Sequence, residues 1–348
     1  MRSHQLRALR ADCPIAECGS FSRTGDDSDV PWHFLILEWR MARVAVVGVG
    51  AIGGVVATLL QSAGRHELVL CVRRPLKELV VETPALGLRS DMTEIRPEMR
   101  IEATILTQPE EAQPVDWIVV ATKAYDAAGA ARWFEWLGAN KAPVAILQNG
   151  VEHRERFAPY LEEDRIVPVI VDCPAERRPT GSDGVDRIAQ RGPMSLKVPK
   201  SETGQAFVDL FEGTAADAAA VEDWTTIAWR KLCHNAAGVL PALLLQPAGV
   251  LRGDAVGDVA LDLVRECVAV GRAAGATLSD SVPEEVLAAY RRSAPDSINS
   301  LHADRLAGRP MEIDARNGVI VRMGKKHRIA TPANSMAVAL LESMTATN

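Results

Sequence analysis

The amino-acid sequence predicts an α/β protein in which a doubly wound, mostly parallel sheet precedes an all-helical C-terminal domain. Two observations support this prediction. Up to about residue 215, short apolar runs alternate with helical segments, which is typical of a parallel sheet with helices on both faces. From Val221 onward, apolar residues recur at helical spacing. We therefore expect the sheet domain over 41–215 and the helical domain over 216–348.

The first forty residues have a different composition. Residues 1–40 are rich in Arg, Asp, Ser, Gly and Cys and show no periodicity, so we expect a poorly ordered extension. Met41 leads directly into the first predicted strand and is the expected translation start. A regulatory tail is the alternative interpretation of this extension.

The segment RVAVVGVGAIGG, residues 43–54, joins a short strand to a helix. Val44–Val47 is an unalternating apolar run, and Ala51–Ala63 has helical spacing. Three glycines between them fit G-x-G-x-x-G, which permits a tight turn and lets the main chain and the helix N-terminus approach a pyrophosphate. A tight turn without a ligand is the alternative. The pattern predicts a Rossmann-type dinucleotide site containing Gly48, Val49, Gly50, Ala51, Ile52 and Gly53.

An arginine pair follows the second predicted strand, Leu68–Val72. An acidic residue at this place would bind a ribose hydroxyl, whereas a guanidinium can grip a 2′-phosphate with two hydrogen bonds. Arg73 and Arg74 therefore favour NADP (NADPH) over NAD, and Arg73 is the predicted phosphate ligand. The alternative is a solvated basic loop.

The remaining elements alternate and then become helical. Further strands are predicted near Gly87–Leu88 and over Ile101–Leu106, Val115–Ala124, Pro143–Gln148 and Ile166–Val171, with a helix over Ala127–Leu137. A loop around Arg178–Gly184 leads to hairpin-like strands at Asp186–Ala189 and Ser195–Val198. Helices are predicted within Trp224–Leu245, Asp254–Gly275, Pro283–Ser293, Ser297–Leu306, Glu312–Lys325 and Asn334–Glu342. We expect the active site in the cleft between the domains, at the carboxyl ends of the strands.

Composition excludes several classes of function. The 39 Lys and Arg against 45 Asp and Glu give a net charge of -6 without a basic tract, so no nucleic acid is expected as a partner. No apolar run reaches the roughly 20 residues that span a bilayer, so we expect no membrane partner and a cytoplasmic protein. Scattered cysteines indicate reduced thiols, and no metal site is predicted. They are Cys13, Cys18, Cys71, Cys173, Cys233 and Cys267.

A lysine on an otherwise apolar helix is the candidate for acid catalysis. Lys231 and Asn235 are four residues apart and share one helix face. If Lys231 faces the cleft, loss of water lowers its pKa from about 10.4 and makes its ammonium a better proton donor. The alternative is a lysine that snorkels at a helix edge. His234 is interpreted as a packing residue.

Five short motifs stand in a fixed order along the chain. They are the glycine motif at 48–53, Thr122–Ala124, Gln148–Gly150, Lys231-Leu-x-x-Asn235 and the segment Ser300–Asp314. This order is the one seen in ketopantoate reductases, and the sequence resembles this family from residue 42 to about residue 340. The resemblance implies an NADPH-dependent 2-dehydropantoate 2-reductase of pantothenate synthesis, with a small 2-oxo acid as its substrate.

The resemblance also implies roles for individual residues. Lys231 matches the lysine that protonates the new alkoxide, and Glu312 matches the glutamate that orients substrate and lysine. The substrate-contacting positions match Asn149, Asn235, Ser300 and Lys123. The cofactor-lining positions match Lys123, Asn149 and Glu312, and a structural acid matches Asp304. Taken singly, three of these residues also have a purely structural interpretation. Asn149 would be a turn residue, Ser300 a helix N-cap and Glu312 a surface carboxylate.

Two questions stay open at the level of sequence. Glu312 beside Lys231 would oppose the pKa drop that desolvation causes, so the net direction is undetermined. Val239 stands where many family members carry a second asparagine, which leaves reduction of another branched 2-oxo acid, or an opine-type dehydrogenase, as an alternative.

A non-catalytic NADP-sensing module is the alternative of another class. The helical domain has enough apolar surface for a homodimer.

Overall fold

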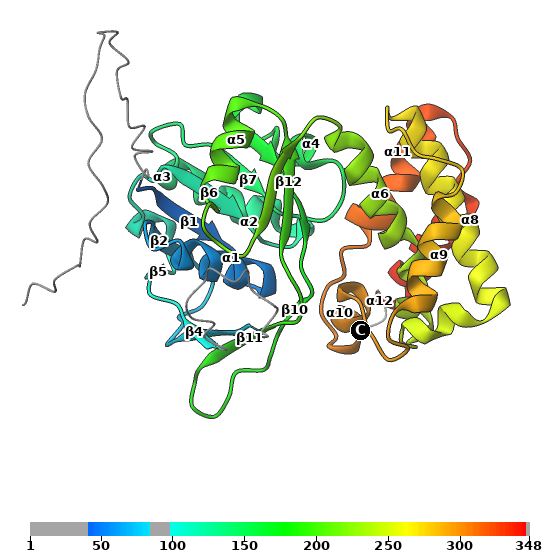
Figure 1. Ribbon diagram of the computed structural model, residues 1–348, viewed down its shortest axis with the longest axis horizontal. Helices are drawn as coiled ribbons and strands as arrows, with labels where there is room; N and C mark the ends of the chain where they lie inside the picture. The colour runs from blue at the N-terminus through cyan, green and yellow to red at the C-terminus, as the bar shows by residue number, and fades with distance from the viewer. Residues whose placement is uncertain (1–40, 84–97, 346–348) are drawn as a thin grey trace, which may run out of the picture. The chain divides into compact units, whose positions relative to one another are not determined.

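The computed structural model of the protein describes residues 41–83 and 98–345, and its first part is built on a six-stranded sheet (Figure 1). The order is β5-β2-β1-β6-β7-β8, and every neighbouring pair is parallel. The strands are β1 Arg43–Val47, β2 Glu67–Cys71, β5 Thr104–Leu106, β6 Trp117–Val120, β7 Val144–Ile146 and β8 Ile166–Pro168. The carboxyl ends of β1, β6 and β7 are therefore adjacent at one edge.

Alternate residues of the central strand belong to two different cores. Val44 and Val46 pack in a cluster with residues of helix α1, whereas Ala45 and Val47 pack with residues of α2 and α3. Both faces of the sheet are thus covered by helices, and the predicted doubly wound fold is confirmed. The helices of this part are α1 Ala51–Ser62, α2 Ala127–Ala131, α3 Phe134–Leu137, α4 His153–Phe157 and α5 Glu202–Asp209, with 3-10 turns η1 Pro109–Glu111, η2 Ala124–Asp126 and η3 Glu163–Arg165.

Two smaller sheets accompany the main sheet. One has the order β10-β11-β3-β4 and the other β13-β12-β9. Their strands are β3 Leu79–Glu82, β4 Glu98–Arg100, β9 Ile170–Asp172, β10 Ala175–Arg177, β11 Asp186–Gln190, β12 Ser195–Pro199 and β13 Asp217–Val221. The predicted hairpin of β11 with β12 is wrong, because β11 pairs with β3 and β10 while β12 pairs with β9 and β13.

The C-terminal part is helical, as predicted, and has its own core (Figure 1). On α8, an added Cβ at Gly271 would lie 2.9 Å from the ring of Trp229 on α6, so this glycine lets the two helices pack closely. The helices are α6 Trp224–Ala237, α7 Val239–Leu244, α8 Asp254–Ala273, α9 Val282–Arg292, α10 Ser300–Leu306, α11 Val319–His327 and α12 Pro332–Thr345, with η4 Ala248–Arg252 and a π-helical turn η5 Asp314–Gly318.

Several predicted boundaries differ from the structure. The helix predicted over Trp224–Leu245 divides at Gly238 into α6 and α7, and the helix predicted from Glu312 begins with the π-helical turn η5. Strand β13 follows the boundary expected at residue 215 and still pairs in a sheet. The strand expected near Gly87–Leu88 and the extension expected over 1–40 lie outside the described residues. Within the described ranges, no helix has both the length and the apolar character of a membrane span.

Candidate active site

The glycine-rich turn after β1 combines close packing with one open face. Gly48 has a φ of +92°, and an added Cβ there would lie 2.6 Å from the Thr122 side chain. A Cβ at Gly53 would lie 2.2 Å from the carbonyl oxygen of Gly48. A Cβ at Gly50 would meet nothing within 4 Å, and within the described chain no side chain caps α1. Gly48 therefore forms the turn, Gly53 lets the first turn of α1 pack against it, and Gly50 leaves open space before the helix N-terminus.

The two arginines after β2 have different surroundings. The side chain of Arg73 is 91% exposed, and its one ion pair with a described residue is a 3.8 Å contact with Asp126. Arg74 instead contacts the buried carboxylate of Asp186 at 3.1 Å, and Asp186 also pairs with Arg177 at 2.7 Å. Arg73 is thus available to an incoming anion, whereas Arg74 belongs to a structural ion-pair cluster.

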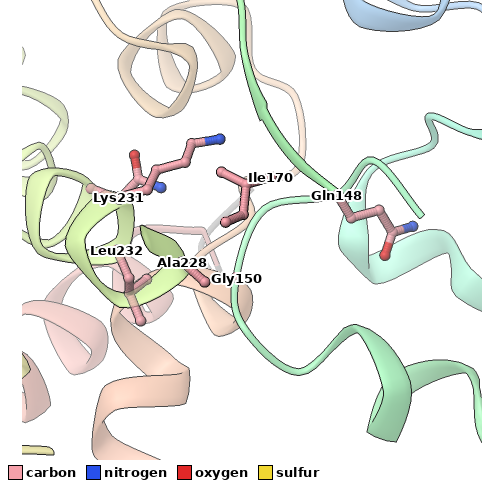
Figure 2. Close-up of a pocket in the computed structure, with 7 residues that line it drawn as sticks. Gln148, Gly150, Ile170, Ala228, Lys231 and Leu232 are labelled. Atoms are coloured by element: carbon pink, nitrogen blue, oxygen red, sulfur yellow. The ribbon is translucent and has the colours of Figure 1, made fainter. Parts of the chain in front are cut away.

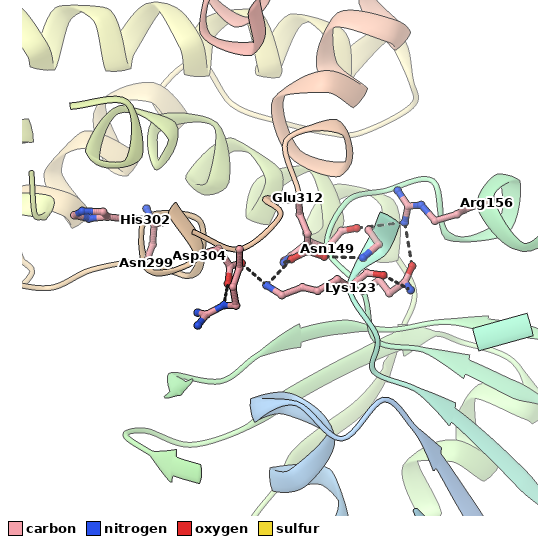
Figure 3. A network of polar contacts seen from close by, with 10 residues as sticks. Lys123, Asn149, Arg156, Asn299, His302, Asp304 and Glu312 are labelled. Atoms are coloured by element: carbon pink, nitrogen blue, oxygen red, sulfur yellow. Dashed lines mark hydrogen bonds and ion pairs between the residues drawn. The ribbon is translucent and has the colours of Figure 1, made fainter. Parts of the chain in front are cut away.

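A buried carboxylate joins the carboxyl ends of β6 and β7 to the helical part (Figure 3). Glu312 accepts hydrogen bonds from the Ala124 N–H at 2.9 Å, from Asn149 Nδ2 at 3.0 Å and from Lys123 Nζ at 3.2 Å. Lys123 Nζ also donates to Asp304 Oδ2 at 2.7 Å. Residues after two sheet strands are therefore tied to two acids of the C-terminal part.

Charge pairing determines how these groups titrate. Burial alone would raise the pKa of Glu312, but the charge of Lys123 and the hydrogen bonds that Glu312 accepts outweigh it, and the pKa is lowered. Burial alone would lower the pKa of Lys123, but the charges of Glu312 and Asp304 outweigh it, and the pKa is raised. Both partners are therefore held in their charged forms at neutral pH.

The turn after β7 lies against the C-terminal part. Gly150 has a φ of +101°, and an added Cβ would lie 2.6 Å from the carbonyl oxygen of Ala315. Gln148, which precedes this turn, is buried and donates to Thr122 Oγ1 at 3.1 Å. The glycine permits the close approach, and the polar bonds fix the adjacent Asn149 where it can reach Glu312.

Lys231 extends from α6 toward the segment that carries Ile170 (Figure 2). It lines a recess of about 10 Å³, room for roughly one water molecule, together with Gln148, Gly150 and Asn235. Its Nζ donates to the backbone carbonyl of Val171. Burial lowers the pKa of Lys231 to about 8, although the charge of Asp172 partly opposes this shift. The lysine can therefore both hold and release a proton near neutral pH.

A larger pocket of about 360 Å³ begins beside this recess. Asn235 lines both cavities. Because Lys231 and Asn235 both line the recess, the prediction that they share a helix face is confirmed. Ser300 and Arg316 also line the larger pocket. Ser300 is the first residue of α10 but does not cap it, because the side chain of Asn299 accepts the capping hydrogen bond from the His302 N–H.

The predicted residues form three groups in the structure. The first group is the glycine turn. The second consists of Lys123, Asn149 and Glu312. The third borders the two adjoining cavities and consists of Lys231, Asn235 and Ser300. Glu312 was expected beside Lys231, where its charge would oppose the drop in the pKa of Lys231. Its charge does oppose that drop, although less than the charge of Asp172 does, and the ion pair of Glu312 is with Lys123.

Two further features were not foreseen from the sequence. Val239 is fully buried and is not among the residues that line the larger pocket. Arg316 lines that pocket and was missed, because nothing in its sequence neighbourhood, which includes Asp314 and Asn317, sets it apart from a surface arginine.

Comparison with known proteins identifies the family. Residues 44–199 match the family model of ketopantoate reductase PanE/ApbA, and residues 223–345 match the model of its C-terminal domain. The chain is 48% identical over 305 residues to a 2-dehydropantoate 2-reductase of Caulobacter vibrioides, covering 87% of this chain and 99% of that protein. It is 38% identical over 299 residues to one of Mycobacterium tuberculosis, covering 86% and 96%.

A solved structure agrees with this assignment. The ketopantoate reductase of Ralstonia eutropha superposes with a TM-score of 0.74 at 28% identity, and the match covers 87% of this chain and 98% of that one. Sequence models match both parts of the chain, and the fold is the same over nearly the whole length of the solved structure. The chain therefore belongs to the ketopantoate reductase family and is an oxidoreductase.

Proposed function

We propose that the protein reduces 2-dehydropantoate to (R)-pantoate with NADPH. The names of its relatives support the reaction. The observation that carries the proposal is the position of Lys231, whose ammonium borders a recess next to the turn after β7, at the carboxyl edge of the parallel sheet. Ligands of such sheets bind outside this edge, so a ketone bound there would lie within reach of a proton donor.

The glycine turn and Arg73 fit a dinucleotide phosphate. The open space beside Gly50 and the uncapped N-terminus of α1 offer backbone N–H groups to a pyrophosphate. Arg73 would bind the 2′-phosphate and so favour NADPH. A bound nicotinamide dinucleotide would supply the hydride for the reaction.

The residues of the chain then perform the remaining steps. Negative charge that develops on the ketone oxygen is stabilised by the ammonium of Lys231, which transfers one proton to that oxygen. Asn235 and Ser300 hold the substrate in the larger pocket next to Lys231. The hydrogen bonds of Lys123 and Asn149 to Glu312 fix the turn after β7, where these three residues would border a bound cofactor and substrate. Burial of Lys231 keeps its proton acidic enough to be transferred.

Steady-state rates with a panel of 2-oxo acids, each with NADPH and with NADH, test this proposal. We expect 2-dehydropantoate to have the highest kcat/KM and NADPH to be preferred over NADH. Simple branched analogues that are reduced equally well would contradict the assigned substrate. The same panel tests the second candidate, reduction of another branched 2-oxo acid.

Homodimer formation stays a prediction. Exposed apolar side chains occur on helices that pack together, Leu244 on α7 and Leu306 on α10. The mass of the particle in solution, measured by light scattering, tests this prediction, and a monomer at all concentrations would contradict it.

A further inference from the structure

The larger pocket contains a buried guanidinium that lacks a counter-ion. Arg316 is only 2% exposed. Its Nη2 donates to the backbone carbonyl of Asn235 at 2.9 Å, and its Nε is buried without a hydrogen-bond partner in the described chain. Among the described residues no carboxylate forms an ion pair with it. A buried, unpaired charge is unfavourable, so a partner from outside the chain would stabilise it.

The other residues of this pocket leave its charge unneutralised. Neither aspartate nor glutamate occurs among the described residues that line it. The ring of His234 stacks on Tyr290 at 4.3 Å, and the Tyr290 hydroxyl donates to the His234 carbonyl. Ser300 adds a hydroxyl to the lining. The pocket therefore combines one permanent cation with neutral polar groups, a combination that suits a small anion.

Arg316 and Lys231 line adjoining cavities. Asn235 lines both the recess of Lys231 and the larger pocket, and its carbonyl accepts the hydrogen bond from Arg316. The charge of Arg316 also contributes to the lowered pKa of Lys231, which requires that the two cations be close. A 2-oxo acid carries its carboxylate on the carbon next to the ketone. One such molecule could therefore engage both cations.

We propose that Arg316 binds the carboxylate of the substrate and makes the pocket select 2-oxo acids over neutral carbonyl compounds. The inference rests on the proposed function and deepens it. The Nη2–H bond to Asn235 orients the guanidinium, and the remaining N–H groups are free to grip two carboxylate oxygens. Ser300 and Asn235 then add neutral hydrogen bonds, while Arg316 supplies the charge.

The test is a binding measurement that needs no turnover. Pantoate and its primary amide, which lacks the charge, are titrated calorimetrically into the NADP-loaded protein. We expect the wild-type protein to bind the acid about 30- to 100-fold more tightly than the amide, as a charge-assisted pair predicts. In Arg316→Met this ratio falls to about threefold or less, and the affinity for the amide stays the same.

Arg165→Met is the matched control. Arg165 is half-buried, and within the described part of the chain its guanidinium donates only to a backbone carbonyl, that of Ala142, at 3.0 and 3.2 Å. It lines neither cavity, so its loss should leave the ratio unchanged. Thermal unfolding of each variant reports on folding. If Arg316→Met does not fold, Arg316→Lys decides, because an ammonium cannot make two parallel bonds and should reduce the ratio about fivefold or more.

Two results would overturn the inference. One is a wild-type protein that binds acid and amide equally, and the other is an Arg316 variant that keeps the full ratio. Failure of the proposed function looks different. If another 2-oxo acid is the better substrate, the acid and amide forms of its product replace pantoate, and the ratio is still measured. Failure of every 2-hydroxy acid to bind would count against Arg316 as well.

Discussion

Lys123 lies at the carboxyl edge of the sheet and Lys231 faces the turn after β7 from helix α6, but the two ammonium groups differ in their pairing. Lys123 contacts two carboxylates, at 2.7 and 3.2 Å, and its pKa is raised. Lys231 donates to the backbone carbonyl of Val171, and the pKa of its ammonium is lowered to about 8. No described carboxylate forms an ion pair with it. The paired lysine holds two parts of the chain together, and the unpaired one can exchange its proton with a ligand.

The arginines after β2 repeat this difference. Arg74 is paired with the buried carboxylate of Asp186, whereas Arg73 is exposed and only loosely paired. Of these two neighbouring arginines, one thus belongs to a structural ion pair, and the other is the proposed phosphate ligand. Pairing within the chain, rather than residue type, separates the two roles.

The largest expected effect is on Lys231. In Lys231→Ala, the single-turnover rate of NADPH oxidation with 2-dehydropantoate should fall about 1,000-fold, because general acid catalysis is lost. The dissociation constant of NADPH should stay within about threefold of wild type, since Lys231 is not in the predicted cofactor site. A rate within tenfold of wild type would contradict the assigned role. Loss of NADPH binding would show instead that the variant is misfolded.

The arginine pair gives the next largest effect. In Arg73→Ala, KM for NADPH should rise about 10- to 100-fold and KM for NADH should barely change, because only NADPH carries a 2′-phosphate. Arg74→Ala is the control, since its charge is already paired with Asp186. Equal effects of Arg73→Ala on both cofactors would rule out recognition of the phosphate by this residue.

Glu312 should matter more for stability than for proton transfer. In Glu312→Gln, the amide keeps an acceptor for the Ala124 N–H but loses the charge that pairs with Lys123. We expect the free energy of unfolding, measured in urea, to fall by about 1–3 kcal/mol. Glu111→Gln, at an exposed position, should leave it unchanged. A stable variant that has lost catalysis would place Glu312 in the chemistry instead.

The stability contributed by Glu312 should also depend on pH. Its pKa in the folded protein is lowered, so the contribution is present above the unfolded value of 4.5 and is lost as pH falls through the folded pKa. The urea unfolding difference between wild type and Glu312→Gln should therefore shrink below pH 4.5. A difference that is constant from pH 7 to well below that value would contradict the ion-pair explanation.

Local features of the fold were predictable, and partners distant in sequence were not. The glycine turn and the parallel strands follow from short apolar runs and spacing, which act within a few residues. The predicted hairpin of β11 and β12 failed because both strands find partners elsewhere in the chain. A run of apolar residues specifies a strand but not its neighbour.

The site shows the same limit. Lys231 and Asn235 were predicted together because helical spacing fixes their shared face. The ion pair of Glu312 with Lys123 was not predicted, because Lys123 reaches Glu312 only through folding of the sheet against the helical part. Arg316 was missed because its missing counter-ion is visible only once the pocket and its lining are known.

The pH dependence of the single-turnover rate tests most directly whether the unpaired lysine is the proton donor. Since the pKa of Lys231 is lowered to about 8, its ammonium is present below that pH and is lost above it. The rate of ketone reduction by the wild-type protein should therefore fall as pH rises past about 8, and this break should be absent from the residual rate of Lys231→Gln. The same break in that variant would contradict proton donation by Lys231.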